Sequence, residues 1–172
     1  MTDYRFYDTC SLLLKANTLF DDDEKIAMSS VTLEELENIK TSATKDIDIK
    51  YAARQLLHKL DEHRGEYDVH IFETGMLGPI VEKGLPTLSN DIRILATAID
   101  YDNKVHPDET IFVTNDLALK NIANLFFGDG IIESVKEDDD NYKGYIECQL
   151  SNDEMEEFYS NPNDNYFNSL IN

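Results

Sequence analysis

Cysteines, long apolar runs and basic residues are all scarce in this chain. Its 172 residues include only two cysteines, Cys10 and Cys148, which follow no metal-binding or redox spacing. A reducing cytoplasm is therefore the simplest compartment, and we expect both thiols to be packing residues. The longest apolar runs, such as Leu12–Leu14, are far too short to span a bilayer, and the first residues lack the basic and apolar regions of a secretion signal. We expect no association with a membrane.

The shortage of basic residues bears on the choice of partner. Fifteen lysines and arginines stand against 35 acidic residues, giving a net charge of −20, and such a field repels phosphate groups. The charge is uneven, however: residues 129–172 hold twelve acidic and two basic residues. Six basic residues cluster between positions 40 and 64, namely Lys40, Lys45, Lys50, Arg54, Lys59 and Arg64. One face of the molecule can therefore still meet a phosphate backbone.

The hydrophobic pattern predicts strands that alternate with helices, which indicates an α/β fold with a mainly parallel sheet. We expect a single domain over residues 1–135 and an acidic C-terminal extension or inter-domain segment over 136–172. The expected strands are 5–7, 26–31, 68–73, 110–114, 130–135 and, in the extension, 142–150. The expected helices are 32–40, 49–64, 90–104, 115–128 and, in the extension, 151–160, whereas 74–89, with three glycines and two prolines, is expected to be a loop.

Four carboxylates fall where predicted strands end or the following helices begin. Asp8 follows the first strand, and Glu35 lies in the first turn of the helix after the second strand. Asp91 opens the helix 90–104, and Asp116 follows the strand 110–114. Because ligands of parallel sheets bind at the carboxyl ends of the strands, we expect these four acids to converge.

Helix capping is the alternative explanation for each acid taken alone. Thr32 and Glu35 have the spacing of a capping box, Asp91 and Asp116 suit helix starts, and Asp8 suits a turn. The conjunction favours a site, because crowded carboxylates repel one another and a hard divalent cation offsets that repulsion. Oxygen ligands without histidine or cysteine suit Mg²⁺ or Mn²⁺ rather than zinc, and such ions are typical of phosphoryl chemistry.

Several stretches resemble the PIN domain family, and most closely the PIN module of PIN–PhoH type proteins. They occur in family order and are "YDTCSLLL", "TLEELENIK", "YAARQLLHKL", "SNDIRILATA", "FVTNDLALKNIA" and "YKGYIECQLSNDEMEEFY". The resemblance implies a three-layer α/β/α sandwich with a C-terminal strand–helix extension. It also implies a ribonuclease site whose acids bind a divalent metal. No phosphate-binding P-loop motif is present, so the ATPase half of such proteins is absent from this sequence.

The resemblance assigns roles to individual residues. It implies that Asp8, Glu35, Asp91 and Asp116 are the catalytic, metal-binding acids. Glu35 is chosen over Glu34 because the family's glutamate directly precedes a leucine, as Glu35 precedes Leu36. Thr114, or its neighbour Asn115, would hold the loop around Asp116 or position water.

Lys40, Lys50 and Arg54 are candidates for binding the RNA backbone near the acids; the alternative is that they form an ordinary exposed helix face. From these features we predict a cytoplasmic Mg²⁺- or Mn²⁺-dependent ribonuclease that cleaves single-stranded RNA with a metal-activated water. A PhoH-type ATPase domain in cis and a homo-oligomer are further possible partners.

The alternatives belong to other classes. A non-catalytic PIN fold that binds RNA or protein, or regulates a partner, is the first rival. A phosphatase of the haloacid-dehalogenase kind needs a second aspartate two residues after Asp8, where Cys10 stands. A receiver domain needs a pair of acids by its first strand and a lysine after a late strand, where "FVTND" offers Thr-Asn-Asp.

Overall fold

A five-stranded parallel sheet forms the centre of the protein. The computed structural model describes residues 3–128 and 131–135. The strands are β1 (Tyr4–Tyr7), β2 (Lys25–Ser29), β3 (Tyr67–His70), β4 (Thr110–Val113) and β5 (Ile132–Glu133). Their order is β3-β2-β1-β4-β5, and every neighbouring pair is parallel. This confirms the predicted mainly parallel α/β sheet.

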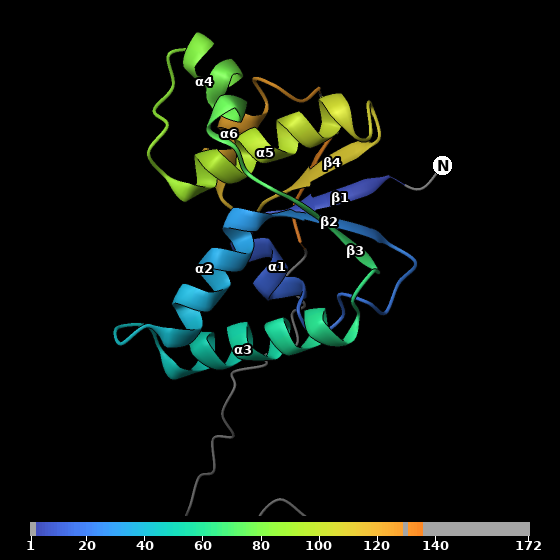
Figure 1. The fold of residues 1–172 in the computed structure, drawn as a ribbon, viewed down its shortest axis with the longest axis vertical. Helices are drawn as coiled ribbons and strands as arrows, with labels where there is room; N and C mark the ends of the chain where they lie inside the picture. Colours follow the sequence, from blue (N-terminus) through green and yellow to red (C-terminus); the bar gives the residue numbers. More distant parts are fainter. Residues whose placement is uncertain (1–2, 129–130, 136–172) are drawn as a thin grey trace, which may run out of the picture. The chain divides into compact units, whose positions relative to one another are not determined.

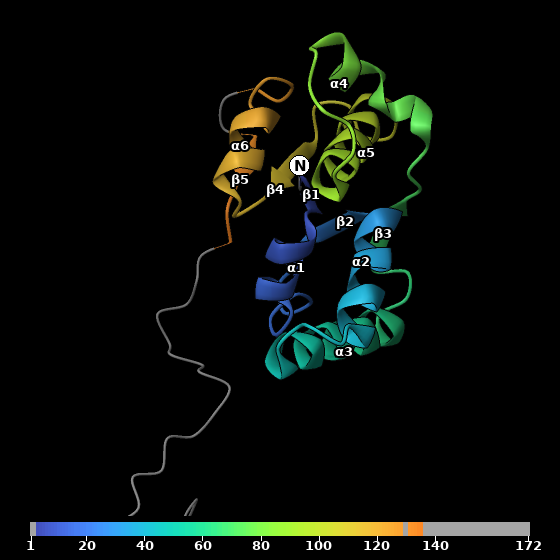
Figure 2. The same cartoon turned by 90° about the vertical axis from the view of Figure 1, so that its left-hand side faces the viewer.

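Helices cover both faces of this sheet (Figures 1 and 2). One face is covered by α1 (Thr9–Lys15), α2 (Ser30–Thr41) and α3 (Ile47–Glu62). The other carries the 3₁₀ helix η1 (Thr74–Leu77), α4 (Gly78–Glu82), α5 (Asn90–Lys104) and α6 (Leu117–Ala123). The three-layer α/β/α sandwich is therefore confirmed. Within the part of the chain that the structure describes, no helix is long and apolar enough to cross a membrane.

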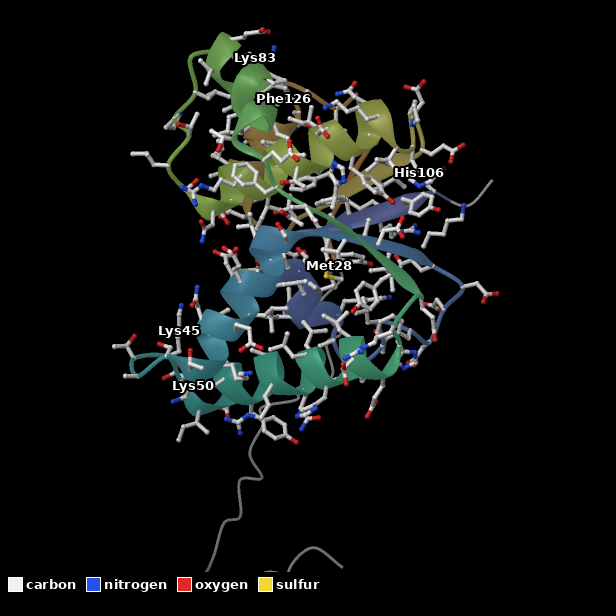
Figure 3. All side chains as sticks on the ribbon, viewed as in Figure 1. Met28, Lys45, Lys50, Lys83, His106 and Phe126 are labelled. Atoms are coloured by element: carbon white, nitrogen blue, oxygen red, sulfur yellow. The ribbon has the colours of Figure 1, made fainter. Side chains whose placement is uncertain are left out.

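The alternation of side chains along the strands separates the core into two layers. Phe6 and Phe112 pack with α5, whereas the next residue of each strand, Tyr7 or Val113, packs on the opposite face. Met28 belongs to that second layer, with side chains of α1, α2 and α3 (Figure 3). Both faces of β1 and β4 are thus buried, as expected for the central strands of a parallel sheet.

Two predictions about the start of the chain are wrong in detail. The helix α1 directly after Asp8 is not among the predicted elements. The predicted strand 26–31 is also too long, because Ser29 ends β2 and caps α2, so that helix begins at Ser30 instead of Thr32. A serine hydroxyl that accepts a bond from an early helical N–H is a strong start signal, and Ser29 accepts from the Val31 N–H.

Two further predictions are corrected in the second half. The segment 74–89 is not all loop, since η1 and α4 occupy its first part. Pro79 lies in the first turn of α4, where a missing N–H costs no helical hydrogen bond, and Gly84 adopts φ +70° shortly after the helix ends. The predicted helix 115–128 is shortened to Leu117–Ala123, and the chain then turns so that Phe127 packs in parallel against Phe112.

The predicted C-terminal extension, with its strand 142–150 and helix 151–160, lies outside the described residues. Its boundary at residue 136 remains a prediction.

Candidate functional site

The register of the sheet brings the ends of β1 and β4 together. Tyr7, the last residue of β1, is paired with both Met28 and Val113. The backbone N–H of Asp8 donates to the Val113 carbonyl at 3.1 Å. The chain crosses from β1 to β2 on one side, while β4 lies on the other side of β1. This reversal of strand order is where open α/β sheets bind their ligands.

Asp8 is both a helix cap and a member of the candidate site. The residue is 3% exposed, and its Oδ1 accepts a hydrogen bond from the Ser11 backbone N–H at 2.7 Å. Oδ2 accepts from the Thr114 hydroxyl at 2.5 Å. The carboxylate is therefore held from two elements, α1 and the end of β4. The turn that the sequence indicated at Asp8 is the N-terminal cap of α1.

Asp116 follows the same pattern at the end of β4. Its Oδ1 accepts from the backbone N–H groups of Ala118 and Leu119, at 2.7 and 2.9 Å, and so caps α6. The backbone N–H of Asp116 donates to Thr114 Oγ1 at 3.1 Å. The buried Thr114 hydroxyl thus bonds to both Asp8 and Asp116.

Glu35 does not form the predicted capping box, because Ser29 caps α2 and Thr32 lies inside the helix. Instead, its Oε2 accepts a hydrogen bond from the Thr9 hydroxyl of α1, and its Oε1 accepts from Asn90 Nδ2 of α5 at 3.0 Å. Its neighbour Glu34 is exposed. Of the two glutamates, Glu35 is therefore the one that reaches α1 and α5.

Asp91, unlike Asp8 and Asp116, has no capping role. Ser89 caps α5 by accepting from the Ile92 N–H at 3.3 Å. Partial burial raises the pKa of Asp91 above its ordinary value, and the nearby charges of Glu35, Asp116 and Asp8 raise it further. Asp91 consequently lies within electrostatic reach of the other three predicted acids.

The Cys10 thiol experiences the same field. Its pKa is raised by partial burial and then by the charges of Asp8, Asp91, Glu35 and Asp116. Its side chain is exposed, so the expectation that Cys10 is a packing residue is wrong. Cys148 lies outside the described residues.

The negative charges of these four acids are not paired with basic side chains in the described part of the chain. Lysine, arginine and histidine form ion pairs across the described part of the chain, and none of those pairs includes Asp8, Glu35, Asp91 or Asp116. The repulsion within the cluster is therefore not relieved by a salt bridge there.

The donor set fits a hard divalent ion that keeps part of its water. Carboxylate oxygens are the ligands that Mg²⁺ and Mn²⁺ prefer. In residues 3–128 and 131–135, no three histidine, cysteine, aspartate or glutamate side chains are placed to hold an ion together. Mg²⁺ is usually bound through only one or two carboxylates and retains several waters. An ion bound by these carboxylates would therefore keep part of its water.

The predicted RNA-binding cations lie mainly around the connection between α2 and α3. Lys40 pairs with Glu37 at 2.6 Å, and Lys50 Nζ donates to the Ser42 carbonyl at 3.2 Å. Figure 3 shows Lys45 and Lys50 together at that connection. Arg54 is exposed on α3. The contacts of Lys40 and Lys50 are local, and neither residue bonds to the four acids.

Sequence reasoning did not assign roles to three polar residues that shape the cluster. Thr9 and Asn90 bond to Glu35, while the buried Ser11 hydroxyl accepts from the Asn115 N–H at 3.0 Å. Each lies within three residues of Asp8 or Asp91. The only hint in the sequence was that each is a short polar residue close to a candidate acid.

The sequence model of the PIN domain family matches residues 6–126. This chain belongs to the PIN domain family. Members are generally nucleases that use divalent metal ions, so the family supports a metal-dependent nuclease fold.

Two solved structures with a similar fold are components of VapBC complexes. One is VapBC2 from Rickettsia felis bound to a DNA fragment from its promoter, with 21% identity and a TM-score of 0.46 over 76% of this chain and 98% of that chain. The other is VapBC-5, a toxin-antitoxin system from Mycobacterium tuberculosis, with 17% identity and a TM-score of 0.48 over 78% and 98%. Both likenesses concern the fold alone. A comparison with curated proteins found no match.

Proposed function

We propose that this protein is a Mg²⁺- or Mn²⁺-dependent ribonuclease that hydrolyses single-stranded RNA at the cluster of Asp8, Glu35, Asp91 and Asp116. The observation that carries the proposal is the geometry of the cluster: Thr114 bonds to both Asp8 and Asp116, and Asn90, the neighbour of Asp91, bonds to Glu35. The pKa of Asp91, raised by burial and by the other three carboxylates, agrees with it. Gathering like charges at the carboxyl edge of a sheet costs free energy, and a bound cation offsets that cost. The PIN domain match over residues 6–126 supports the same class of chemistry.

The four acids would contribute to a cation site in different ways, at most two of them directly and the others through the water that the ion keeps. Asp8 is buried and fixed by Ser11 and Thr114, so it offers a carboxylate whose position does not depend on the cation. Asp91 and Asp116 are exposed and can meet a cation and a substrate from solvent. When bound, a divalent ion lowers the pKa of a water ligand and stabilises charge on phosphoryl oxygens. Asp116 Oδ1 caps α6, so Oδ2 is the oxygen left to face such a ligand.

The substrate assignment rests on charge distribution. With a net charge of −20, the protein attracts nucleic acid only through local contacts. Lys50 and Arg54 supply such contacts on α3, and Lys45 joins them because its backbone N–H donates to Ser42, whose carbonyl accepts from Lys50 Nζ. Lys40 is the weakest of the predicted substrate-binding residues, since Glu37 neutralises it. A PhoH-type ATPase in cis and a cytoplasmic location complete the proposal.

Cleavage of a labelled single strand tests this function. We expect the wild-type chain to cut RNA with Mn²⁺ or Mg²⁺ and to stop when EDTA is added, and Asp91→Asn to lose most of the rate. Asp48→Asn is the matched control, because Asp48 also lies in the first turn of a helix but outside the cluster. Equal rates for wild type and Asp91→Asn, or cutting that persists in EDTA, would overturn the proposal.

A non-catalytic PIN module is the second candidate. It is favoured by the engagement of both carboxylate oxygens of Asp8 and of Glu35 in bonds within the protein. Such bonds can serve a site that only holds the fold together. This candidate predicts RNA binding without cleavage under every metal condition of the same assay.

A further inference from the structure

The Glu35 carboxylate is held between two helices other than its own. From α1, the Thr9 hydroxyl donates to Oε2, and from α5, Asn90 Nδ2 donates to Oε1 at 3.0 Å. Asn90 is separated from Glu35 by 55 positions in the chain, and it directly precedes Asp91. The bond therefore links two of the four acids through the backbone at the start of α5.

The environment fixes which end of the Asn90 amide faces Glu35. An ionised carboxylate only accepts hydrogen bonds, so the NH₂ group must point toward it. The amide oxygen then faces the other way, and it accepts from Arg93 Nη1 at 3.5 Å. Arg93 in turn lies 5.9 Å from the centre of the Phe72 ring. The amide is thus engaged on both sides.

We propose that Asn90 is a positioning residue, which orients Glu35 for cation binding without neutralising it. This inference rests on the proposed function, because it requires that Glu35 contribute to the binding of a divalent ion. A lysine at the same place would orient the carboxylate equally well but would supply the charge that the cation should provide. An amide gives the hydrogen bond and leaves the negative charge in place. Thr9 has the same property on the opposite oxygen.

Binding of Mn²⁺ to the full chain, followed by the electron paramagnetic resonance signal of free Mn²⁺, tests this without RNA. We expect Asn90→Ala to weaken binding by about 10-fold or more, as is usual when a group that orients a metal ligand is removed. Asn103→Ala is the matched control. That asparagine lies on the same helix and donates to the Ile99 carbonyl at 2.7 Å, so its loss should leave the Mn²⁺ affinity unchanged.

The decisive comparison uses a second background. If Asn90 acts through Glu35, then Asn90→Ala should cause no further loss of Mn²⁺ affinity in a Glu35→Gln chain. The same loss in both backgrounds, no loss in the wild-type background, or the absence of Mn²⁺ binding by the wild-type chain would each overturn the inference.

Thr9 provides an independent route should Asn90→Ala fail to fold. Thr9→Val keeps the shape of the side chain and removes the hydroxyl, whereas Thr9→Ser keeps the hydroxyl. We expect weaker Mn²⁺ binding for valine and near wild-type binding for serine; equal affinities would count against the positioning of Glu35 by its neighbours.

The result is separable from that of the cleavage assay. If the affinity depends on Asn90 through Glu35 but no RNA is cut, the proposed function fails and the inference stands. If RNA is cut while Asn90→Ala binds Mn²⁺ normally, the inference fails and the function stands.

Discussion

At the scale of single residues, the four acids divide by what holds them. Asp8 and Asp116 each cap a helix, so capping and site formation are two consequences of one position rather than alternatives. Asp91 has no such role, because Ser89 caps its helix. Its charge is opposed by three carboxylates and compensated by no cation in the described part of the chain, which makes it the most informative residue to change.

Asp91→Asn should raise the melting temperature in EDTA at neutral pH. The pKa of Asp91 is raised in the folded state, so folding favours its protonated form. The cost of its charge is therefore absent below the pKa of the unfolded chain and fully present above the folded-state pKa. The advantage of asparagine should accordingly shrink as the pH falls through that window. Thermal denaturation from neutral to acid pH measures this.

Asp48→Asn controls for the favourable interaction of a first-turn aspartate with the helix dipole. It should melt at or below the wild-type temperature. If Asp91→Asn also melts lower in EDTA, the carboxylate stabilises α5 through its dipole more than the cluster repels it. Added Mn²⁺ should stabilise the wild type more than Asp91→Asn, by about 2.7 kcal/mol for the wild type at 100 times its Kd.

Thr114 offers a second test at this scale. Its buried hydroxyl donates to Asp8 and accepts from the Asp116 N–H. Thr114→Val keeps the shape but leaves a buried carboxylate with one donor fewer, so we expect a loss of about 1–3 kcal/mol in urea denaturation. Thr114→Ser should retain most of the stability. Thr110→Val is the control from the same strand, because the Thr110 hydroxyl donates to the His106 carbonyl at 3.3 Å and lies near Asp102, away from the four acids. An equal loss of stability in Thr110→Val would show that the Thr114 bond between Asp8 and Asp116 contributes nothing beyond an ordinary buried hydroxyl.

At the scale of elements, long amphipathic segments are well predicted from the sequence and short ones are not. The helix α5 has the predicted bounds, since its apolar stripe is long and its start follows a capping serine. The seven-residue helix α1 is missing from the prediction because the polar residues after Asp8 indicated a turn or ligand. Short helices such as α4 and α6 depend on packing against the sheet, which no local pattern encodes.

The candidate site, too, is predictable from the sequence only in part. That Asp8 and Asp116 lie at one edge follows from the ends of β1 and β4, because parallel strands share that edge, whereas Glu35 and Asp91 lie on the helices α2 and α5. The partners of those acids do not follow, because the bond from Asn90 to Glu35 crosses 55 positions and depends on how α5 packs against α2. The Thr32–Glu35 spacing was misleading for the same reason: the local pattern fits a cap, whereas tertiary contacts engage both glutamate oxygens.

The start of α2 gives a prediction at this scale. Ser29 Oγ accepts from the Val31 N–H, so Ser29→Ala should cost about 1 kcal/mol in chemical denaturation. The Thr32 hydroxyl is buried and has no hydrogen-bond partner among the described residues. Thr32→Val should therefore leave the stability unchanged or raise it. If Thr32→Val proves the more destabilising of the two, the helix begins at the capping box after all.

At the scale of the whole molecule, the net charge determines how strongly RNA is repelled. A charge of −20 opposes association, while Lys50 and Arg54 lie on α3, next to the helix that carries Glu35. Weak binding is then expected from the domain as a whole, and any local attraction should fade as salt screens it.

Charge reversal at both positions tests whether α3 guides the strand. Lys50→Glu with Arg54→Glu should slow the initial cleavage of labelled RNA at low ionic strength, and less at high ionic strength, because screening weakens the lost attraction. The Mn²⁺-induced melting shift should be unchanged, since neither residue belongs to the acid cluster.

Lys25→Glu with Lys83→Glu is the matched control. It makes the same change in net charge, from −20 to −24, at exposed lysines in β2 and directly after α4. If both double variants slow cleavage equally, total charge governs the encounter and α3 has no special role. If the α3 variant cuts as fast as wild type at both ionic strengths, α3 is an ordinary solvated face, and the strand must reach the acids from another side.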